Sequence, residues 1–196
     1  MFDTALTLKD LGFLMQGAAV TLAVTLISVA FGTLLGLVFG ILKAQFHWLV
    51  MAPLTFVLDV LRSVPLLIQL ILVNAFQSIL MLGLSPFLVA CVVLSLYTAA
   101  YCTEIVRGGI DAVPAVTRRA ARSLGMTWRQ DMANITLPMA ARVALPGWIG
   151  LALGVMKDSA LILWLGIIEL LRASQILVTR LQEPLFFLMV AGAIYF

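Results

Sequence analysis

Charged side chains lie inside apolar stretches long enough to span a membrane. The clearest case is Lys157-Asp158, within the segment GLALGVMKDSALILWLG. The pair follows the start of its stretch by about 18 Å of helix, which is near mid-membrane. Ionisable groups at that depth are energetically expensive and are functional candidates. Two adjacent charges cannot share one helix face, so at least one is predicted to face the protein interior or a watery cavity.

Two further pairs, Asp59 with Arg62 and Glu104 with Arg107, are spaced three residues apart, where helical side chains meet. Pro65 follows the first pair and is predicted to break the helix, freeing carbonyls that need a partner or water. Two interpretations remain open: structural ion pairs near the membrane interface, where long side chains reach water, or contacts to a transported molecule. The polar candidates in these stretches are Asp59, Arg62, Gln69, Tyr101 and Glu104.

The composition predicts an all-α integral membrane protein. Of the 196 residues, 63% are hydrophobic and only 11% are charged, whereas soluble domains carry about 25% charged residues. We expect one membrane domain over residues 1–196, with spans at about 17–42, 53–82, 87–106, 144–167 and an incomplete fifth at 185–196. In the first span, Gly32, Gly36 and Gly40 predict a helix-packing face. Residues 168–184 are expected to form a partly helical excursion, and the fifth span is expected to be cut short.

Residues 111–142 form the long polar stretch of the chain. Its arginines and aspartates are Arg118, Arg119, Arg122, Arg129, Arg142, Asp111 and Asp131. An excess of arginine marks a cytoplasmic loop, which places the N-terminus outside. An ordinary basic loop would show the same excess, so the charge alone does not predict a binding role.

Local signals in this stretch predict two short helices. Asp111 is expected to cap the first helix, and Gly125 to stop it in a left-handed conformation. Thr127 and Gln130 have the spacing of a capping box, which predicts the start of the second helix. Pro138 is expected to end that helix. A helix–glycine–helix elbow of this kind is suited to docking a soluble partner.

The elbow resembles the signature loop of the membrane subunits of bacterial ABC importers: Glu-Ala-Ala, three residues, Gly, nine residues, then Ile-x-Leu-Pro. Arg119 occupies the position of the glutamate. The resemblance implies that the loop is a coupling helix held in a cleft of a cytoplasmic ATPase, and a compensating acid on the ATPase is then expected opposite Arg119. The implied ATPase-coupling residues are Arg119, Ala120, Ala121, Leu124, Gly125, Met126, Ile135, Leu137 and Pro138.

Three other segments resemble the polar amino-acid importers of the histidine, glutamine and glutamate type. They are residues 59–67, the segment AAYCTEIVRGGI at 99–110, and residues 157–170. The resemblance covers nearly the whole chain and implies a type I ABC importer-like transmembrane domain of about five helices. Its implied partners are cytoplasmic ATPase subunits, a second identical or paralogous permease, membrane lipid, and a periplasmic or lipid-anchored amino-acid-binding protein. It also implies the bacterial inner membrane, and ATP with Mg bound by the ATPase rather than by this chain.

An amino acid carries a carboxylate and an ammonium group, which the charged residues of the spans are suited to complement. The candidates for the translocation path are Asp59, Arg62, Gln69, Tyr101, Glu104, Lys157 and Asp158. The carried amino acid and the choice between homodimer and heterodimer are not set by these residues.

Motifs for other activities are missing from the sequence. There is no GxxxxGK[ST], GxSxG, HExxH or CxxC, and one histidine with two distant cysteines predicts neither a metal site nor a catalytic triad. We therefore expect no enzyme activity in this chain and no nucleic-acid partner. The alternative is a self-contained secondary transporter or channel subunit, which would usually need more spans or inverted repeats.

Overall fold

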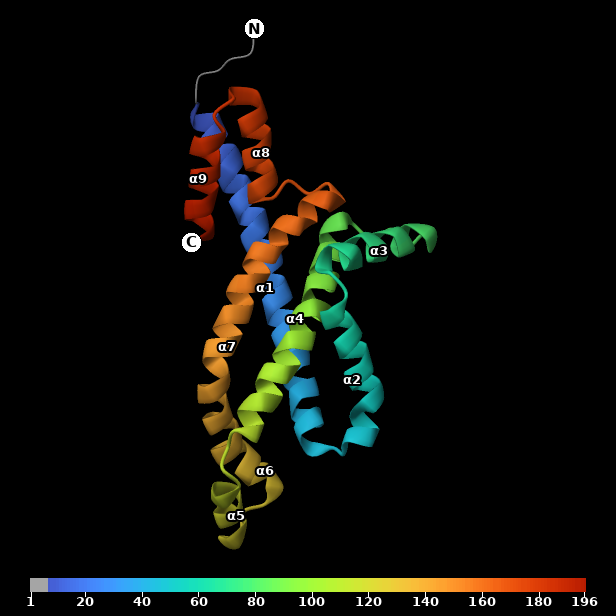
Figure 1. Ribbon diagram of the computed structural model, residues 1–196, viewed down its shortest axis with the longest axis vertical. Coiled ribbons are helices and arrows are strands. Elements are labelled where there is room, and N and C mark those ends of the chain that lie inside the picture. The colour runs from blue at the N-terminus through green and yellow to red at the C-terminus, as the bar shows by residue number, and fades with distance from the viewer. Residues whose placement is uncertain (1–6) are drawn as a thin grey trace. The chain divides into compact units, whose positions relative to one another are not determined.

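The computed structural model describes residues 7–196, and every regular element among them is helical, which confirms the predicted all-α class. In chain order the elements are α1 Leu8–Gln45, α2 Trp48–Ser63, α3 Leu66–Ile79, α4 Pro86–Asp111, α5 Ala115–Ser123, α6 Trp128–Asp131, the π-helix η1 Met132–Thr136, α7 Leu137–Asp158, the 3-10 helix η2 Ser159–Leu165, α8 Leu170–Leu181 and α9 Pro184–Tyr195 (Figure 1).

Among the described residues, three helical segments are long and apolar enough to cross a membrane: Leu8–Gln45, Pro86–Asp111 and Trp128–Leu165. The predicted span 53–82 is instead two helices, because Pro65 lacks an N–H and stands as the N-cap of α3. Counting α2 and α3 as one broken span gives four. The predicted fifth span corresponds to α9, a short apolar helix of 12 residues.

Two predictions about helix ends were wrong. Asp111 does not cap α5; it is the last residue of α4, where its carboxylate accepts a hydrogen bond from Arg107 one turn earlier. Pro138 does not end a helix but lies at the start of α7. In the preceding π-turn the Leu137 N–H donates to the Met132 carbonyl, five residues back, so the hydrogen-bond register shifts by one residue just before Pro138. The shift leaves one carbonyl of the turn without a backbone N–H donor, and the missing N–H of Pro138 falls at that place. Pro138 is therefore accommodated without a break.

The chain divides into two compact units. The first unit comprises Met1–Val29, Pro65–Leu94 and Gly154–Phe196, and the second comprises Ala30–Val64 and Ser95–Leu153. The long helices α1, α4 and α7 contribute residues to both units, so each unit contains only part of each of them.

In the first unit, α8 and α9 pack beside the N-terminal part of α1 (Figure 1). Two polar contacts stabilise this packing. The Leu170 N–H donates to Thr21 Oγ1 at 3.2 Å, and Arg180 pairs with Asp10, which is only 3% exposed. The buried apolar residues of this core are Leu14, Ala18, Leu170, Ala173, Leu177, Leu181, Phe187 and Ala191.

In the second unit, the glycine face of α1 lies directly against α4, as the spacing of the glycines predicts. A Cβ added at Gly36 would lie 2.5 Å from Cys102 Cβ, and one added at Gly40 would lie 2.7 Å from Val106 Cβ. A third contact joins α1 to α7, where Trp148 Nε1 donates to Thr33 Oγ1 at 2.8 Å. Any Cβ at Gly36 or Gly40 would lie under 3 Å from α4, so glycine at these positions permits the close approach of α1 to α4 within the unit.

Candidate functional site

The elbow between α5 and α6 is built by two capping motifs. The Gly125 N–H donates to the Arg122 carbonyl at 3.0 Å, and the Met126 N–H donates to the Ala121 carbonyl at 3.2 Å. This is the Schellman pattern, and Gly125 has the left-handed φ of 80° that the pattern requires. The predicted glycine stop is therefore confirmed.

The second helix of the elbow begins as its sequence predicts. Thr127 Oγ1 accepts a hydrogen bond from the Gln130 N–H, and Gln130 Oε1 accepts one from the Thr127 N–H at 2.8 Å, which completes the capping box. The helix is short because the π-helix η1 follows it immediately. The caps at both ends of residues 124–127 give the elbow a defined shape rather than that of a loose linker.

The predicted coupling residues fall into a supporting group and an exposed group. Ala121 is 2% exposed and faces the interior of the elbow, and Leu137 packs against the apolar core of the second unit. Leu124 is 82% exposed at the tip. Met126 and Ile135 are half-buried, and the remaining exposed members are Arg119, Ala120, Gly125 and Pro138.

A chain of ionic contacts runs along the C-terminal turns of α4. Glu104 pairs with Lys43 of α1 through one carboxylate oxygen and accepts from Arg107 Nε at 3.0 Å through the other. Arg107 Nη1 in turn donates to Asp111 Oδ2 at 2.7 Å. The Glu104–Arg107 pairing is as predicted. Sequence reasoning missed Lys43, because its partner lies 61 positions away and no local signal connects them.

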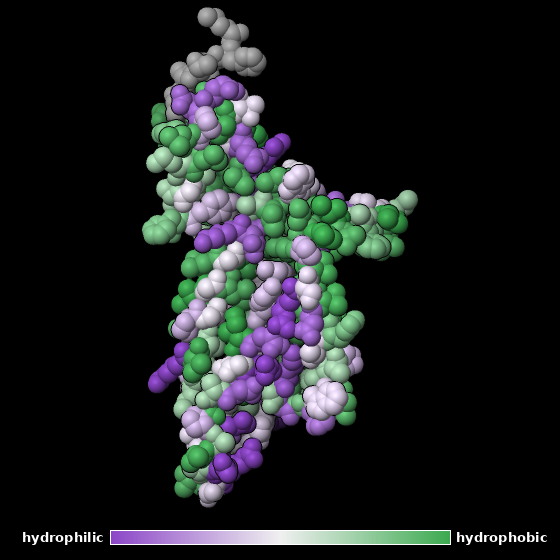
Figure 2. Space-filling model, in the orientation of Figure 1, coloured by the Kyte–Doolittle hydropathy of each residue, from purple (hydrophilic) through white to green (hydrophobic). Residues whose placement is uncertain are grey.

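Lys43, Glu104 and Arg107 also line a cavity of about 600 Å³ between the C-terminal part of α1, α2 and α4. Arg62 pairs with Asp59, as predicted, and the Tyr101 hydroxyl donates to the Arg62 carbonyl at 3.4 Å. Among the described residues, Arg62 Nε is buried without a hydrogen-bond partner. Figure 2 shows hydrophilic side chains gathered between hydrophobic flanks over the C-terminal half of α4. The cavity thus offers both cationic and anionic groups to a ligand.

The structure brings four predicted path residues into one unit and places three in the other. Asp59, Arg62, Tyr101 and Glu104 belong to the second unit. In the first unit, Gln69 is 7% exposed on α3, Asp158 is half-buried at the end of α7, and Lys157 beside it is exposed. Among the described residues, no ion pair involves Lys157 or Asp158.

Glu169, which the resemblance includes without assigning it a role, is fully buried before α8. Its carboxylate accepts from the N–H groups of Leu171 at 2.7 Å and Arg172 at 2.6 Å, and from the Tyr195 hydroxyl at 3.0 Å. Burial raises the pKa of Glu169, and the two N–H donors oppose that rise. The residue therefore caps α8 and ties it to α9, a structural role.

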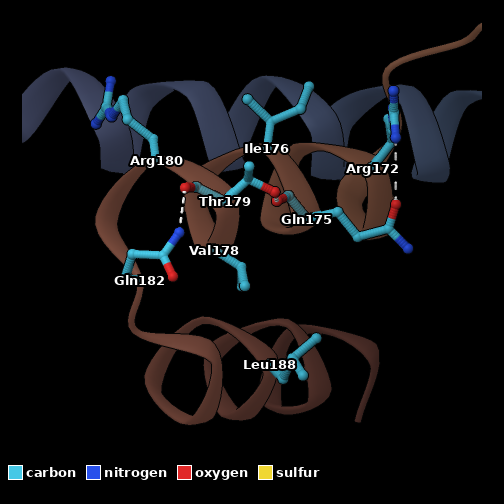
Figure 3. A pocket seen from close by; sticks show the side chains of 8 residues that line it. All are labelled: Arg172, Gln175, Ile176, Val178, Thr179, Arg180, Gln182 and Leu188. Carbon is cyan, nitrogen blue, oxygen red and sulfur yellow. Dashed lines mark hydrogen bonds between the residues drawn. The ribbon is translucent and has the colours of Figure 1, made fainter. Parts of the chain in front are cut away.

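A separate groove of about 1040 Å³ lies on α8 and α9. Figure 3 shows Arg172 and Arg180 at opposite ends of α8, with Leu188 on the neighbouring helix α9. Two hydrogen bonds join residues that line the groove: Arg172 donates to Gln175 at 3.5 Å, and Gln182 donates to the Thr179 carbonyl at 2.7 Å. No predicted site residue lines this groove.

A model of the family described as "Binding-protein-dependent transport system inner membrane component" matches residues 32–196. The chain belongs to this family. As a member of an inner-membrane permease family with several apolar helices, the protein is membrane-embedded.

Named relatives cover nearly the whole chain. The chain is 30% identical over 199 residues to the arginine transport system permease protein ArtQ of Bacillus subtilis, covering 99% of this chain and 89% of the relative. It is also 30% identical over 209 residues to the glutamate/aspartate import permease protein GltK of Escherichia coli O6:H1, covering 100% of this chain and 91% of the relative. Both relatives are named as permease proteins of amino-acid transport systems.

Solved structures agree with this family. The crystal structure of an amino acid ABC transporter with histidines matches with a TM-score of 0.85 and 28% identity, over 95% of this chain and 87% of the other. The MetNI methionine ABC transporter in an inward-facing conformation matches with a TM-score of 0.75 and 20% identity, over 96% of this chain and 99% of the other. The second match bears on the fold alone, and the fold is that of type I ABC importer permeases.

Proposed function

We propose that this chain is the permease subunit of an ATP-driven amino-acid importer, and that its elbow couples transport to a cytoplasmic ATPase. The observation that carries the proposal is the doubly capped elbow with its exposed tip, in a member of a transport-permease family. Its relatives, among them ArtQ and GltK, are named for the transport of amino acids. Leu124 at the tip is an exposed apolar side chain, and contact with a partner protein would remove it from water.

The assembly we propose contains two permeases, identical or paralogous, two ATPase subunits and an amino-acid-binding protein in the bacterial inner membrane. ATP and Mg bind to the ATPase and not to this chain, since the sequence lacks a phosphate-binding loop. The arginines of residues 111–142 support a cytoplasmic elbow and an outside N-terminus.

The cavity of the second unit is the proposed contact with the carried amino acid. Arg62 lines that cavity, and its guanidinium group is suited to a carboxylate. Asp59 and Glu104 line the same space; the half-exposed Asp59 is suited to an ammonium group directly, whereas Glu104 would have to exchange its pairing with Lys43 or Arg107. Gln69, Lys157 and Asp158 remain candidates for a separate part of the path in the first unit. No specific observation favours the alternative of a self-contained secondary transporter or channel.

The test is ATP hydrolysis in nanodiscs containing the full chain, its second permease and the ATPase of the same importer. We compare Gly125→Val with Gly83→Val, because both glycines have a positive φ, of 80° and 65°, and neither has a neighbour within 4 Å of an added Cβ. A β-branched residue is strained at both positions.

Hydrolysis stimulated by the amino-acid-loaded binding protein should fall in Gly125→Val and persist in Gly83→Val, with both complexes intact by size-exclusion chromatography. Uptake driven by an ion gradient in vesicles that contain no ATPase would overturn the proposal.

A further inference from the structure

Three arginines surround a pocket of about 300 Å³ at the base of the elbow. Arg118, Arg119 and Arg122 of α5 contribute the cationic lining, and Ile110 and Val113 contribute apolar lining. Arg118 and Arg122 lie one helical turn apart, so both project from the same face of α5. Arg119 and Arg122 are exposed, and Arg118 is half-buried.

The acidic groups of the elbow neutralise this pocket only in part. Asp111 lines it, but its carboxylate is bound by Arg107 at 2.7 Å. Asp131 is fully buried and accepts from Thr136 Oγ1 at 3.1 Å. Its Oδ2 lies 3.7 Å from Arg118 Nε, which is within ion-pair range but too long for a hydrogen bond. Within the described residues of the elbow, Arg119 and Arg122 have no carboxylate partner.

We infer that this pocket receives an aspartate or glutamate side chain of the ATPase subunit. The loop then supplies the positive charge and the ATPase the negative charge, the reverse of the arrangement expected for a loop with glutamate at position 119. This inference rests on the proposed function, because it specifies the partner surface of the same elbow. Guanidinium groups bind carboxylates through paired, charge-assisted hydrogen bonds. A second arginine then holds the same carboxylate from another side.

A protein side chain fits this surface better than a free anion or a lipid headgroup. Val116 and Leu124 are 71% and 82% exposed on the same elbow, beside the arginines. Protein–protein interfaces typically have an apolar core with a polar rim. Apolar side chains next to a charged pocket match this arrangement, and one protein partner can cover both. The ATPase cleft is accordingly expected to be apolar with an acidic rim.

The experiment measures binding of the ATPase subunit to the full permease in nanodiscs, for Arg119→Glu, Arg122→Glu and Arg129→Glu. Arg129 is the matched control, because it is exposed on the same elbow and gives the same charge change but does not line the pocket. We expect Arg119→Glu and Arg122→Glu to weaken binding about tenfold or more, and Arg129→Glu by about threefold or less. Arg119→Lys, which keeps the charge and loses the paired geometry, should fall between wild type and Arg119→Glu.

A charge-swap scan then identifies the partner residue. Each acidic residue of the ATPase surface is changed to lysine, and one such change should restore binding to Arg119→Glu. Equal weakening by all three elbow variants, or unchanged binding in Arg119→Glu, would overturn the pocket inference. Unfolding temperatures equal to wild type show that a loss of binding is not a loss of folding.

A photo-crosslinker in place of Leu124 separates this inference from the proposed function. If Leu124 crosslinks to the ATPase while Arg119→Glu leaves ATPase binding unchanged, the coupling role stands and only the proposed acidic contact is removed. No crosslink from Leu124, with no stimulated hydrolysis, would remove both.

Discussion

Glu104 is the residue on which the ionic contacts of the second unit converge. The side chain of its partner Lys43 is only 9% exposed, so losing the carboxylate leaves a largely buried ammonium group without its counter-charge. We expect Glu104→Gln to lower the free energy of unfolding by about 1–3 kcal/mol. Thermal unfolding in detergent, followed with a thiol-reactive dye, measures this because the thiols of Cys91 and Cys102 are buried in the folded protein.

The matched control for Glu104→Gln is Asp59→Asn. Asp59 also pairs with an arginine, but its side chain is 48% exposed and solvent replaces the lost contact. Its removal should change the unfolding free energy by less than about 1 kcal/mol. Equal losses in the two variants would show that burial of Lys43 does not set the strength of the contact.

At the scale of helices, the contact between α1 and α4 depends on glycine. Gly36→Ala introduces a Cβ that would lie 2.5 Å from Cys102 Cβ and 2.8 Å from its sulfur, so the helices must move apart. We expect a loss of about 1–3 kcal/mol in unfolding free energy. Gly12→Ala on the same helix has nothing within 4 Å, and the higher helix propensity of alanine should leave it neutral or stabilising by about 1 kcal/mol. A Gly36→Ala variant as stable as Gly12→Ala would contradict this packing.

Some elements of the elbow could be predicted from sequence and others could not. Gly125 and the capping box at Thr127 depend on neighbouring residues alone, so local spacing was sufficient to predict them. Pro138 looked like a helix end because the rule for proline assumes α-helical bonding, and the π-turn before it has a different pattern. Asp111 had a good capping spacing but lies in α4, where Arg107 offers it a partner.

At the scale of the whole molecule, fold class was predictable because an apolar composition leaves few alternatives to membrane helices. The contacts between helices were less predictable. The glycine spacing predicted a packing face but not its partner, and Lys43 gave no sign of pairing with a residue 61 positions away. The path residues were selected by charge and apolar context, and this criterion could not assign Asp59 and Lys157 to different units.

The molecule separates residues proposed to contact the carried amino acid from residues proposed to contact the ATPase, and the two groups should fail differently. Arg62→Gln removes a cation from the cavity and leaves Asp59, which is half-exposed, to water. Loss of a hydrogen-bonded charge corresponds to about 1.5–3 kcal/mol, or roughly a 10- to 150-fold rise in the KM for the amino acid. Stimulated ATP hydrolysis should continue, so the amount of amino acid imported per ATP falls.

Gly125→Val, by contrast, should reduce import and stimulated hydrolysis together, because the elbow no longer transmits movement in either direction. Arg142→Gln, an exposed position on α7 outside the cavity, serves as the control for loss of one positive charge and should change neither quantity. The measurement is radiolabelled amino-acid uptake and phosphate release in the same proteoliposomes. If Arg62→Gln lowered hydrolysis in proportion to uptake, the cavity would belong to the coupling machinery, and contact with the amino acid would have to be sought at Lys157 and Asp158.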